Sequence, residues 1–330
     1  MSRREGYLSG GGASGENWYV SGRNEILSYQ SAPSTQTGFS SCQMAVAATG
    51  FFDGVHLGHR KVIQALVSSA HENGEEAVVV TFDSHPRTVL QQDAGKLRLL
   101  TTTQERRELL LSLGVDRVET LSFSRSFASM SAEQYIREIL VERFGASTLV
   151  LGYDNRLGSD RLGVDDIRSL CSDMGIESIS VDPYVMSDGV TVSSTRIRTA
   201  LAEGNVGCAS KMLGYRYMLT GVVVSGKQLG RTIGFPTANT LPSAPLKLVP
   251  ARGVYLTEVD VLGERFYGMT NIGDVVETNI FDFDESIYGL ELTLHFISRI
   301  RDMRVMEGLD DLKKQLSTDK LTAQRMLADL

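Results

Sequence analysis

Residues 50–60 read GFFDGVHLGHR and place two histidines, His56 and His59, three positions apart among small residues. The stretch directly follows MAVAA (44–48), a short apolar run typical of a buried strand, and leads into a segment (60–74) with apolar residues at helical spacing. A helix N-terminus carries unpaired N–H groups and a partial positive charge, and both favour phosphate. The pattern therefore predicts a strand–turn–helix unit that holds a nucleotide.

Histidines at this spacing also occur in metal sites and in ordinary turns. Zinc would need at least one further His, Cys or carboxylate ligand at a recognisable spacing, and none is obvious, although Asp53 is close. Gly54 and Gly58 would let the backbone approach a phosphate closely. A turn with two solvated histidines is the alternative interpretation.

The composition is that of an acidic chain with an ordinary hydrophobic content. Its 330 residues suggest about two domains, its net charge of −7 disfavours a nucleic-acid partner, and no apolar run approaches the ~20 residues of a membrane span. The first residues lack the apolar core of a signal peptide. Three scattered cysteines, Cys42, Cys171 and Cys208, fit free thiols in a reducing cytoplasm. We therefore expect a cytoplasmic protein that acts on small molecules, with no nucleic acid and no membrane as partner and with self-association left open.

Segments with strand and helix patterns alternate in the first part of the chain. AVVVTF (77–82) and STLVLG (147–152) are continuous apolar runs, as expected for strands covered on both faces. Such alternation predicts a parallel sheet with helices on both faces, and ligands then bind beyond the carboxyl ends of the strands. Two helical segments begin with residues spaced as capping boxes, which are Thr102 with Glu105 and Ser131 with Gln134.

From Tyr217 onward, apolar and polar residues alternate by twos, and glycines separate the segments. Several short antiparallel strands of this kind predict a small β-barrel. In its last strand, the apolar residues expected to share one face are Leu290, Leu292, Leu294 and Phe296. The tail between Gly308 and Leu330 returns to a helical pattern, with Leu309, Leu312 and Leu316 in register.

These patterns divide the chain into three segments. We expect residues 1–42, which are polar and rich in Gly and Ser, to form a flexible extension. Residues 43–205 should form a Rossmann-like parallel α/β domain. Residues 206–330 should form a small antiparallel β-barrel domain with a C-terminal helix.

Three further segments carry polar side chains that a nucleotide could use. TFDSHP (81–86) ends the second strand, and LGYDNRLG (151–158) follows the fourth. VSSTRIR (192–198) combines hydroxyls with two arginines, and these groups together can bind phosphates. Each segment also has an ordinary interpretation, as a turn set by a proline, a surface loop or a helix cap. The candidate ligands in them are His85, Asp154, Arg156, Ser194, Thr195, Arg196 and Arg198.

The barrel half begins with a glycine-rich stretch, GKQLGRTIGFPTANT (226–240). It lacks the lysine and helix of a P-loop, which excludes that phosphate-binding motif. Thr237 and Asn239 are hard oxygen donors two residues apart, so in an extended segment they face the same side and suit Mg²⁺ shared with nucleotide phosphates. A glycine-rich hairpin loop followed by a surface strand is the alternative.

In this order, GFFDGVHLGH, TFDSHP, LGYDNRLG and SSTRIR resemble the nucleotidyltransferase module of bacterial bifunctional riboflavin kinase/FMN adenylyltransferases. The resemblance implies that His56 and His59 act on ATP phosphates together with the Ser/Thr/Arg segment, in which Ser194, Thr195 and Arg196 are matched and Arg198 lies nearby. From their places in the turn and at the same edge of the sheet, the other residues expected against the nucleotide are Gly50, Asp53, Gly54, His85, Asp154 and Arg156.

GRTIGFPTAN, GVYLTEV, NIG and DFDESIYG resemble the riboflavin kinase module of the same enzymes. The resemblance implies that Thr237 and Asn239 bind Mg²⁺–ATP and that Glu277 is the base that takes a proton from riboflavin. Arg301 matches an arginine near the flavin or the phosphate. The remaining candidate ligands of the glycine-rich loop are Gly226, Gly230, Arg231 and Gly234.

The implied function is a two-step synthesis, in which riboflavin and ATP give FMN, and FMN and ATP give FAD and pyrophosphate. Two alternatives stay open. After NIG the family continues with Arg-Pro-Thr and a longer loop, whereas here DVVE follows almost at once, so an FMN adenylyltransferase with an impaired kinase is one alternative. The other is a non-catalytic flavin-binding regulator, although such a regulator would not need residues that bind ATP phosphates.

Overall fold

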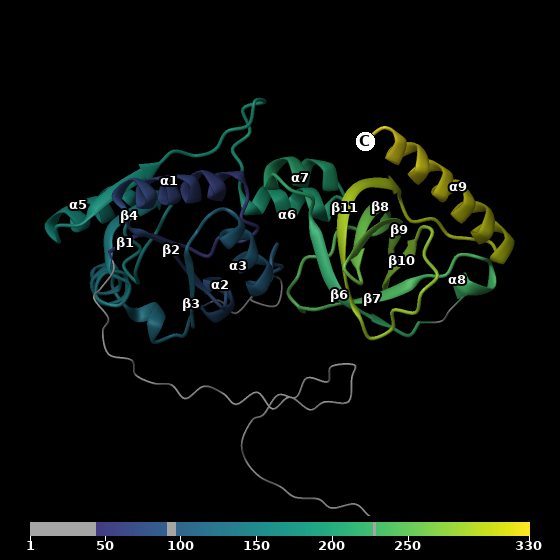
Figure 1. Cartoon of the computed structure of the whole chain (residues 1–330), viewed down its shortest axis with the longest axis horizontal. Helices are drawn as coiled ribbons and strands as arrows, with labels where there is room; N and C mark the ends of the chain where they lie inside the picture. Colours follow the sequence, from purple (N-terminus) through teal and green to yellow (C-terminus); the bar gives the residue numbers. More distant parts are fainter. Residues whose placement is uncertain (1–43, 91–96, 227–228) are drawn as a thin grey trace, which may run out of the picture. The chain divides into compact units, whose positions relative to one another are not determined.

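The structure is a computed structural model that describes residues 44–90, 97–226 and 229–330 (Figure 1). The predicted flexible extension of residues 1–42 lies outside the described residues, and so does Cys42. The parallel α/β part, the β-barrel and the C-terminal helix that the sequence predicts are all present.

A sheet of five parallel strands forms the centre of the first part of the chain, in the order β3-β2-β1-β4-β5. Its strands are β1 (Ala45–Thr49), β2 (Glu76–Phe82), β3 (Arg117–Leu121), β4 (Ala146–Gly152) and β5 (Glu177–Val181). The order reverses between β1 and β4, and such a switch point is where parallel sheets bind ligands. The GFFDGVHLGH segment leaves the sheet at this point, directly after β1.

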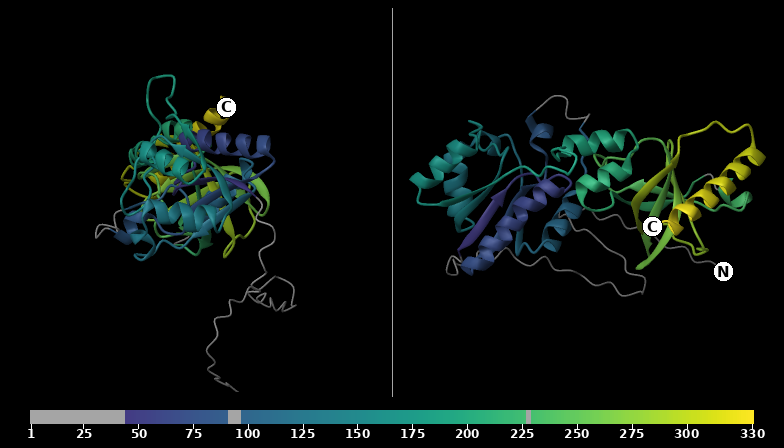
Figure 2. Two further views of the ribbon diagram at one scale, coloured as in Figure 1. Left: turned by 90° about the vertical axis from the view of Figure 1, so that its left-hand side faces the viewer. Right: turned by 90° about the horizontal axis from the view of Figure 1, so that it is seen from above.

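Helices cover both faces of this sheet (Figure 1, Figure 2). They are α1 (Leu57–Asn73), α2 (Pro86–Leu90), α3 (Thr103–Ser112), the 3₁₀-helix η2 (Phe127–Ser129), α4 (Ala132–Gln134), the π-helix η3 (Tyr135–Val141) and α5 (Val164–Asp173). Ile63 and Leu66 of α1 pack with Leu110 of α3 against one face. Ile136 of η3 and Ile167 of α5 pack against the other, so the central strands are buried on both sides.

The second part of the chain is a closed barrel with the strand order β10-β7-β6-β11-β8-β9. Its strands are β6 (Met218–Val224), β7 (Ala238–Pro242), β8 (Gly253–Val261), β9 (Glu264–Ile272), β10 (Val276–Ile280) and β11 (Glu291–Arg301). A short helix, α8 (Leu229–Thr232), lies in the glycine-rich loop between β6 and β7. The C-terminal helix, α9 (Leu309–Ala328), packs Leu316 and Ala323 against Leu256 and Met269 of the barrel.

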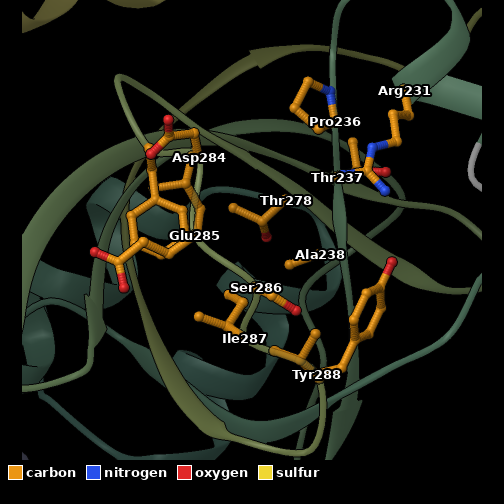
Figure 3. Close-up of a pocket in the computed structure, with 13 residues that line it drawn as sticks. Arg231, Pro236, Thr237, Ala238, Thr278, Asp284, Glu285, Ser286, Ile287 and Tyr288 are labelled. Carbon is orange, nitrogen blue, oxygen red and sulfur yellow. The ribbon is translucent and has the colours of Figure 1, made fainter.

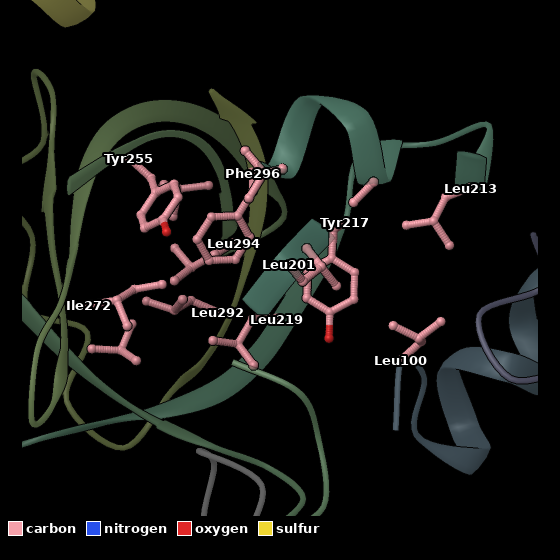
Figure 4. Close-up of a cluster of buried hydrophobic side chains, with 14 of the residues drawn as sticks. Leu100, Leu201, Leu213, Tyr217, Leu219, Tyr255, Ile272, Leu292, Leu294 and Phe296 are labelled. Atoms are coloured by element: carbon pink, nitrogen blue, oxygen red, sulfur yellow. The ribbon is translucent and has the colours of Figure 1, made fainter. Parts of the chain in front are cut away.

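Two helices, α6 (Ser194–Ala202) and α7 (Val206–Leu213), connect the sheet to the barrel. They belong to one continuous hydrophobic core, which also contains barrel residues and Leu100, which lies three residues before the start of α3 (Figure 4). In this core, α6 contributes Leu201 and α7 contributes Leu213, and β11 contributes Leu294 and Phe296. The segment around Leu100 therefore packs with the barrel as well as with its own sheet.

Three details differ from the sequence-based expectation. The capping box at Ser131 is present, but the helix continues from Tyr135 as a π-helix, which buries Tyr135 and Leu140 five positions apart. Leu290 does not share the buried face of β11, because Gly289 forms a turn (φ 77°) and the strand begins only afterwards. Leu309 is exposed, because it is the first residue of α9 and precedes the buried part of that helix.

Candidate active sites

His56 caps the N-terminus of α1, because its Nδ1 accepts a hydrogen bond from the backbone N–H of His59 (3.3 Å). The two imidazole rings stack, with centroids 3.7 Å apart and an angle of 14° between their planes. Since Nδ1 of His56 is an acceptor, its proton lies on Nε2, which can donate to a ligand. The structure therefore brings the two predicted histidines together at the start of a helix.

Both histidines are neutral at pH 7. Burial lowers the pKa of His56 to about 4 and outweighs the nearby Asp53 carboxylate, which acts in the opposite direction. Burial also holds the pKa of His59 well below its usual value, and His56 adds to this effect. Nδ1 of His59 is buried without a hydrogen-bond partner. The pair can therefore serve as neutral hydrogen-bonding groups, not as fixed cations.

Asp53 is part of the framework of this turn. Its buried carboxylate accepts hydrogen bonds from the backbone N–H groups of Leu100 (2.9 Å) and Thr101 (3.0 Å) and pairs with Arg198 (2.5 Å). The hydroxyl of Ser194 donates to the carbonyl oxygen of Asp53 (3.0 Å). Two predicted ATP ligands, Ser194 and Arg198, thus hold the turn in place through Asp53.

The other predicted ligands of this site lie at different depths. His85 packs edge-on against Phe51, with ring centroids 4.6 Å apart, and burial lowers the pKa of His85 to about 4. Thr195 and Arg196 are exposed in the first turn of α6. Asp154 is exposed just after β4. It does not line the cavity that lies beyond the carboxyl ends of β1 and β2.

An aromatic cavity of about 650 Å³ lies beyond the carboxyl ends of β1 and β2. Phe82, Phe123 and Phe127 pack edge-to-face along it, with centroid distances of 5.3 to 5.6 Å. Two predicted ligands, Gly50 and Arg156, also line it. A cavity with several ring faces suits a planar heterocycle.

Asn155, in the LGYDNRLG segment, lines this cavity and is part of its framework. Its Oδ1 accepts from the backbone N–H of Gly152 (2.6 Å), and its Nδ2 donates to the carbonyl oxygen of Thr49 (3.2 Å). Thr49 ends β1 and Gly152 ends β4, so this one side chain joins the two strand ends at the switch point.

A cavity of about 840 Å³ in the barrel half collects most of the predicted kinase residues. Glu277 of β10 lies opposite Asn239 of β7 and opposite Asn271 of β9 in the antiparallel register. Nδ2 of Asn271 donates to Oε2 of Glu277 (3.4 Å). The predicted residues that line this cavity are Gly226, Gly230, Thr237, Asn239, Glu277 and Arg301.

Arg301, the last residue of β11, is held by α9. Its guanidinium forms a two-pronged ion pair with Asp319, with N···O distances of 2.8 to 3.0 Å, and Asp319 is 2% exposed. Gln315 also donates to Asp319 (2.8 Å). The C-terminal helix thus sets the position of a cavity-lining arginine and adds Leu312 and Leu316 to the same wall.

A smaller cavity of about 280 Å³ adjoins the larger one at Thr237, which lines both. Arg231 and Thr237 lie on one side of it, and Asp284 and Glu285 lie on the other (Figure 3). Tyr288 adds an aromatic ring to the wall. Gly234 is not among the residues that line either cavity, and its φ of 85° marks a turn in the glycine-rich loop.

Two family models match the chain, that of FAD synthetase over residues 39–196 and that of riboflavin kinase over residues 213–327. The bifunctional riboflavin kinase/FMN adenylyltransferase of Bacillus subtilis (strain 168) is 33% identical to this chain, over 87% of the chain and 93% of its own length. The chain belongs to this family. The relative of the same name from Escherichia coli (strain K12) is 34% identical, over 84% of this chain and 91% of its own length.

A solved structure supports the family's architecture for this chain. The crystal structure of a macrolide-efflux protein from Streptococcus pneumoniae matches with a TM-score of 0.81 and 32% identity, over 87% of this chain and 96% of that one. Its name refers to drug efflux, whereas both family models and the two bacterial relatives refer to flavins and their nucleotides. In the part of the chain that the structure describes, no helix is both long and apolar enough to cross a membrane.

Sequence reasoning missed several residues that line or frame these cavities. The aromatic lining of Phe82, Phe123 and Phe127 was not singled out, although each follows or ends a strand pattern at the ligand-binding edge. Asp319 was missed because its partner, Arg301, lies on another element. The burial of Asp319 becomes visible only in the structure, so the sequence offered no signal for it.

Proposed function

We propose that this chain makes FMN and then FAD, by phosphorylating riboflavin with one ATP and adenylylating FMN with a second. Residues 43–205 carry out the adenylyl transfer, and residues 206–330 carry out the phosphorylation. The single observation that supports the kinase most directly is the register of β7 and β10, which puts Glu277 beside Asn239 on one cavity wall. That arrangement is present despite the short turn after NIG, and so it favours a working kinase over an impaired one.

The kinase step needs a proton acceptor, because its nucleophile is an alcohol. As the ribityl 5′-oxygen of riboflavin bonds to the γ-phosphorus of ATP, the bond from that phosphorus to the β–γ bridging oxygen breaks and ADP leaves. A carboxylate of Glu277 takes the hydroxyl proton. Asn271, which donates to Glu277 from the neighbouring strand, orients this carboxylate toward the cavity.

The oxygens of Thr237 and Asn239 fit a magnesium ion that is shared with ATP phosphates. They are uncharged hard donors on one cavity wall, and Mg²⁺ in such sites takes few protein ligands and several phosphate or water oxygens. Gly226 packs so tightly over the Asn239 side chain that a Cβ there would clash with its amide. When bound, Mg²⁺ would neutralise charge on the β- and γ-phosphates.

The two barrel cavities suit the two substrates of this step. The smaller one, with Pro236 and Tyr288 beside Arg231, suits the nucleoside and phosphates of ATP. The larger one contains Glu277 and Arg301 and has room for a tricyclic flavin with its ribityl chain. Thr237 lines both, at the point where the γ-phosphate must meet the hydroxyl.

The adenylyl transfer needs no base, because the phosphate of FMN is already an anion at pH 7. One of its oxygens bonds to the α-phosphorus of ATP while the bond to the leaving pyrophosphate breaks. His56 donates from Nε2, with His59 stacked behind it and the N-terminus of α1 alongside, so charge on the leaving group meets hydrogen-bond donors and a positive dipole. The aromatic cavity takes the flavin ring of FMN.

We place these reactions in the cytoplasm, with riboflavin, FMN and ATP as the partners. The two cysteines in the described part of the chain, Cys171 and Cys208, are free thiols, which fits a reducing compartment. ATP is also abundant there. Fractionating the native cells and assaying each fraction for FMN and FAD synthesis tests this placement; activity confined to an exported fraction would contradict it.

One incubation tests the proposed chemistry. Purified protein receives riboflavin, ATP and Mg²⁺, and chromatography identifies the flavins formed; a parallel sample receives FMN instead of riboflavin. We expect FMN followed by FAD in the first sample and FAD in the second. FAD from FMN without any FMN from riboflavin would instead support the adenylyltransferase with an impaired kinase. Flavin binding without ATP consumption would support the regulator.

A further inference from the structure

The turn that carries His56 has a backbone that needs support from outside. Phe52 (φ 52°) and Val55 (φ 38°) have positive φ values, which are unfavourable for residues with a side chain. Val55 is β-branched, which makes its conformation especially costly. Surrounding contacts must therefore hold this conformation.

One contact of this kind comes from Tyr215, which lies inside the riboflavin kinase match. Its hydroxyl donates to the carbonyl oxygen of Gly54 (2.7 Å), two residues before His56. Burial raises the pKa of Tyr215, so the hydroxyl keeps its proton and remains a donor. Arg60 of α1 lies over the Tyr215 ring, 5.3 Å from its centroid, which ties the ring to the helix that follows the turn.

A second contact comes from Lys247, also inside the kinase match. Its side chain is 1% exposed; Nζ donates to the carbonyl oxygen of Leu100 (2.8 Å) and pairs with Glu105 (2.6 Å). Leu99 exchanges two backbone hydrogen bonds, of 2.7 and 2.8 Å, with the residues on either side of Lys247. The segment before α3 is thus bound to the kinase part by both backbone and side chain.

That segment in turn holds the turn. The backbone N–H groups of Leu100 and Thr101 donate to the carboxylate of Asp53, and the N–H of Gly54 donates to the hydroxyl of Thr101 (3.0 Å). A Cβ on Gly54 would meet the Leu100 side chain at 2.8 Å, which shows how closely the two segments pack. An unbroken series of polar contacts therefore leads from Lys247 to the residues just before His56.

We propose that the kinase part of the chain is a structural component of the adenylyltransferase site, with Tyr215 and Lys247 as positioning residues for the turn that carries His56. This inference rests on the proposed adenylyl transfer. Neither residue lines the aromatic cavity, so both act through the backbone of the turn. The two activities of one chain then depend on these residues unequally, because neither residue is among those that line the barrel cavities.

The sharper test is Tyr215→Phe, which removes a single hydroxyl. We expect kcat for FAD synthesis from FMN to fall by about tenfold or more, because small misplacements of catalytic groups are costly, with a smaller change in KM. FMN synthesis from riboflavin should stay within about twofold of wild type. The matched control is Tyr255→Phe, which also removes a hydroxyl bonded to a backbone carbonyl inside the kinase match, that of Ala251. Equal FAD synthesis by the two variants would overturn the proposal.

Lys247→Met provides a stronger perturbation, because it leaves the buried Glu105 carboxylate without its ion-pair partner. The double variant Lys247→Met/Glu105→Gln removes that charge and keeps the capping box, which accepts Gln as well as Glu. We expect the double variant to regain thermal stability but not FAD synthesis, since Leu100 still lacks its donor. Lys211→Met, at an exposed lysine of α7, controls for the loss of a positive charge.

Recovery of FAD synthesis together with stability in the double variant would reduce Lys247 to a stabilising role and refute its part in positioning. Loss of both activities in every Lys247 variant would indicate unfolding, and the decision then rests on Tyr215→Phe. Failure of the inference is distinct from failure of the proposed function: wild-type protein that makes no FAD rejects the function, whereas active wild type with unaffected variants rejects only the positioning role.

Discussion

The two sites that we propose for ATP offer opposite kinds of side chain. At the strand-to-helix turn, His56 and His59 are buried and neutral, and the carboxylate of Asp53 is occupied by Arg198 and backbone N–H groups. In the barrel, Glu277 lies on the wall of a large cavity beside an amide side chain. One site thus offers neutral imidazoles that burial makes weakly basic, and the other offers a carboxylate that can accept a proton.

This difference follows from the nucleophile that each reaction uses. A phosphate is ionised already and needs only alignment and stabilisation of the leaving group, whereas an alcohol must lose a proton as it attacks. ATP is the substrate of both reactions, but it requires different side chains depending on whether a phosphate or an alcohol attacks it. Substitutions that separate the two activities within one chain test this contrast directly.

The largest effect is expected for Glu277→Gln. Removing the base should lower FMN synthesis from riboflavin by about 10³-fold, within the range usual for general bases, and spare FAD synthesis from supplied FMN. Steady-state assays of the two reactions measure this. Glu291→Gln, at an exposed glutamate that begins β11, is the control. Normal FMN production by Glu277→Gln would remove the assignment of the base.

The His56→Ala/His59→Ala double variant should show the reverse pattern. Loss of these donors is expected to reduce FAD synthesis by at least about 10²-fold while FMN synthesis from riboflavin continues. Steady-state assays of FMN synthesis and of FAD synthesis again measure the two effects separately. His71→Ala changes an exposed histidine of the same helix and should leave both rates unchanged. Retained FAD synthesis in the double variant would refute the role of the histidines in the transfer.

Asn239→Ala sharpens the contrast by testing the proposed magnesium ligand. We expect FMN synthesis to fall by about ten- to 100-fold and to require more Mg²⁺ for half-maximal rate, because a metal–phosphate contact is lost. Titrating Mg²⁺ at fixed ATP measures this. Thr199→Val, on the exposed side of α6, is a control that lies outside both barrel cavities. An unchanged Mg²⁺ requirement would exclude Asn239 as a ligand.

Asp319→Asn should have a smaller effect on the same reaction. The amide cannot pair with both nitrogens of Arg301 as the carboxylate does, so Arg301 becomes less well placed and KM for riboflavin should rise by about three- to tenfold. FAD synthesis should not change. Asp310→Asn, at an exposed position of the same helix, is the matched control. A fall in FAD synthesis of equal size would point to general destabilisation.

The smallest effect concerns pH and stability. The pKa of His56 is lowered from 6.5 to about 4 on folding. Between these pH values the unfolded chain carries a proton on His56 and the folded chain does not. The stability that neutral His56 contributes is therefore lost as pH falls from about 6.5 toward 4. The shift corresponds to at most about 3 kcal/mol. His56→Asn keeps an N-cap acceptor but cannot titrate. Its melting temperature should therefore depend less steeply on pH over this range than that of wild type or of His71→Asn.

Much of this contrast could be predicted from the sequence. The alternation of strand and helix patterns, the capping box at Thr102 and the period-two pattern after Tyr217 are local features, and each produced the expected element. Thr237 and Asn239 line one cavity, as an extended segment would allow, although β7 begins only at Ala238 and their role as metal ligands stays a prediction. Local rules succeed in these places because neighbouring residues decide the backbone conformation.

The contacts of individual side chains were harder to predict from the sequence. Ser194 and Arg198 were expected at ATP phosphates, but their contacts go to Asp53, which is far away in the sequence. Tyr215 and Lys247 gave no signal, since an isolated tyrosine or lysine in a loop carries no pattern. Burial and partner choice depend on how distant segments pack, and no periodicity encodes that.

The sequence by itself determined the two architectures, the family and the residue types available for each reaction, because motif spacing and hydrophobic period are properties of the linear chain. Only the tertiary structure decided that Glu277 lies opposite Asn239, that burial keeps His56 and His59 neutral, and that the barrel half supports the turn of the transferase half. These are consequences of register, desolvation and long-range hydrogen bonding, which exist only when distant segments have come together.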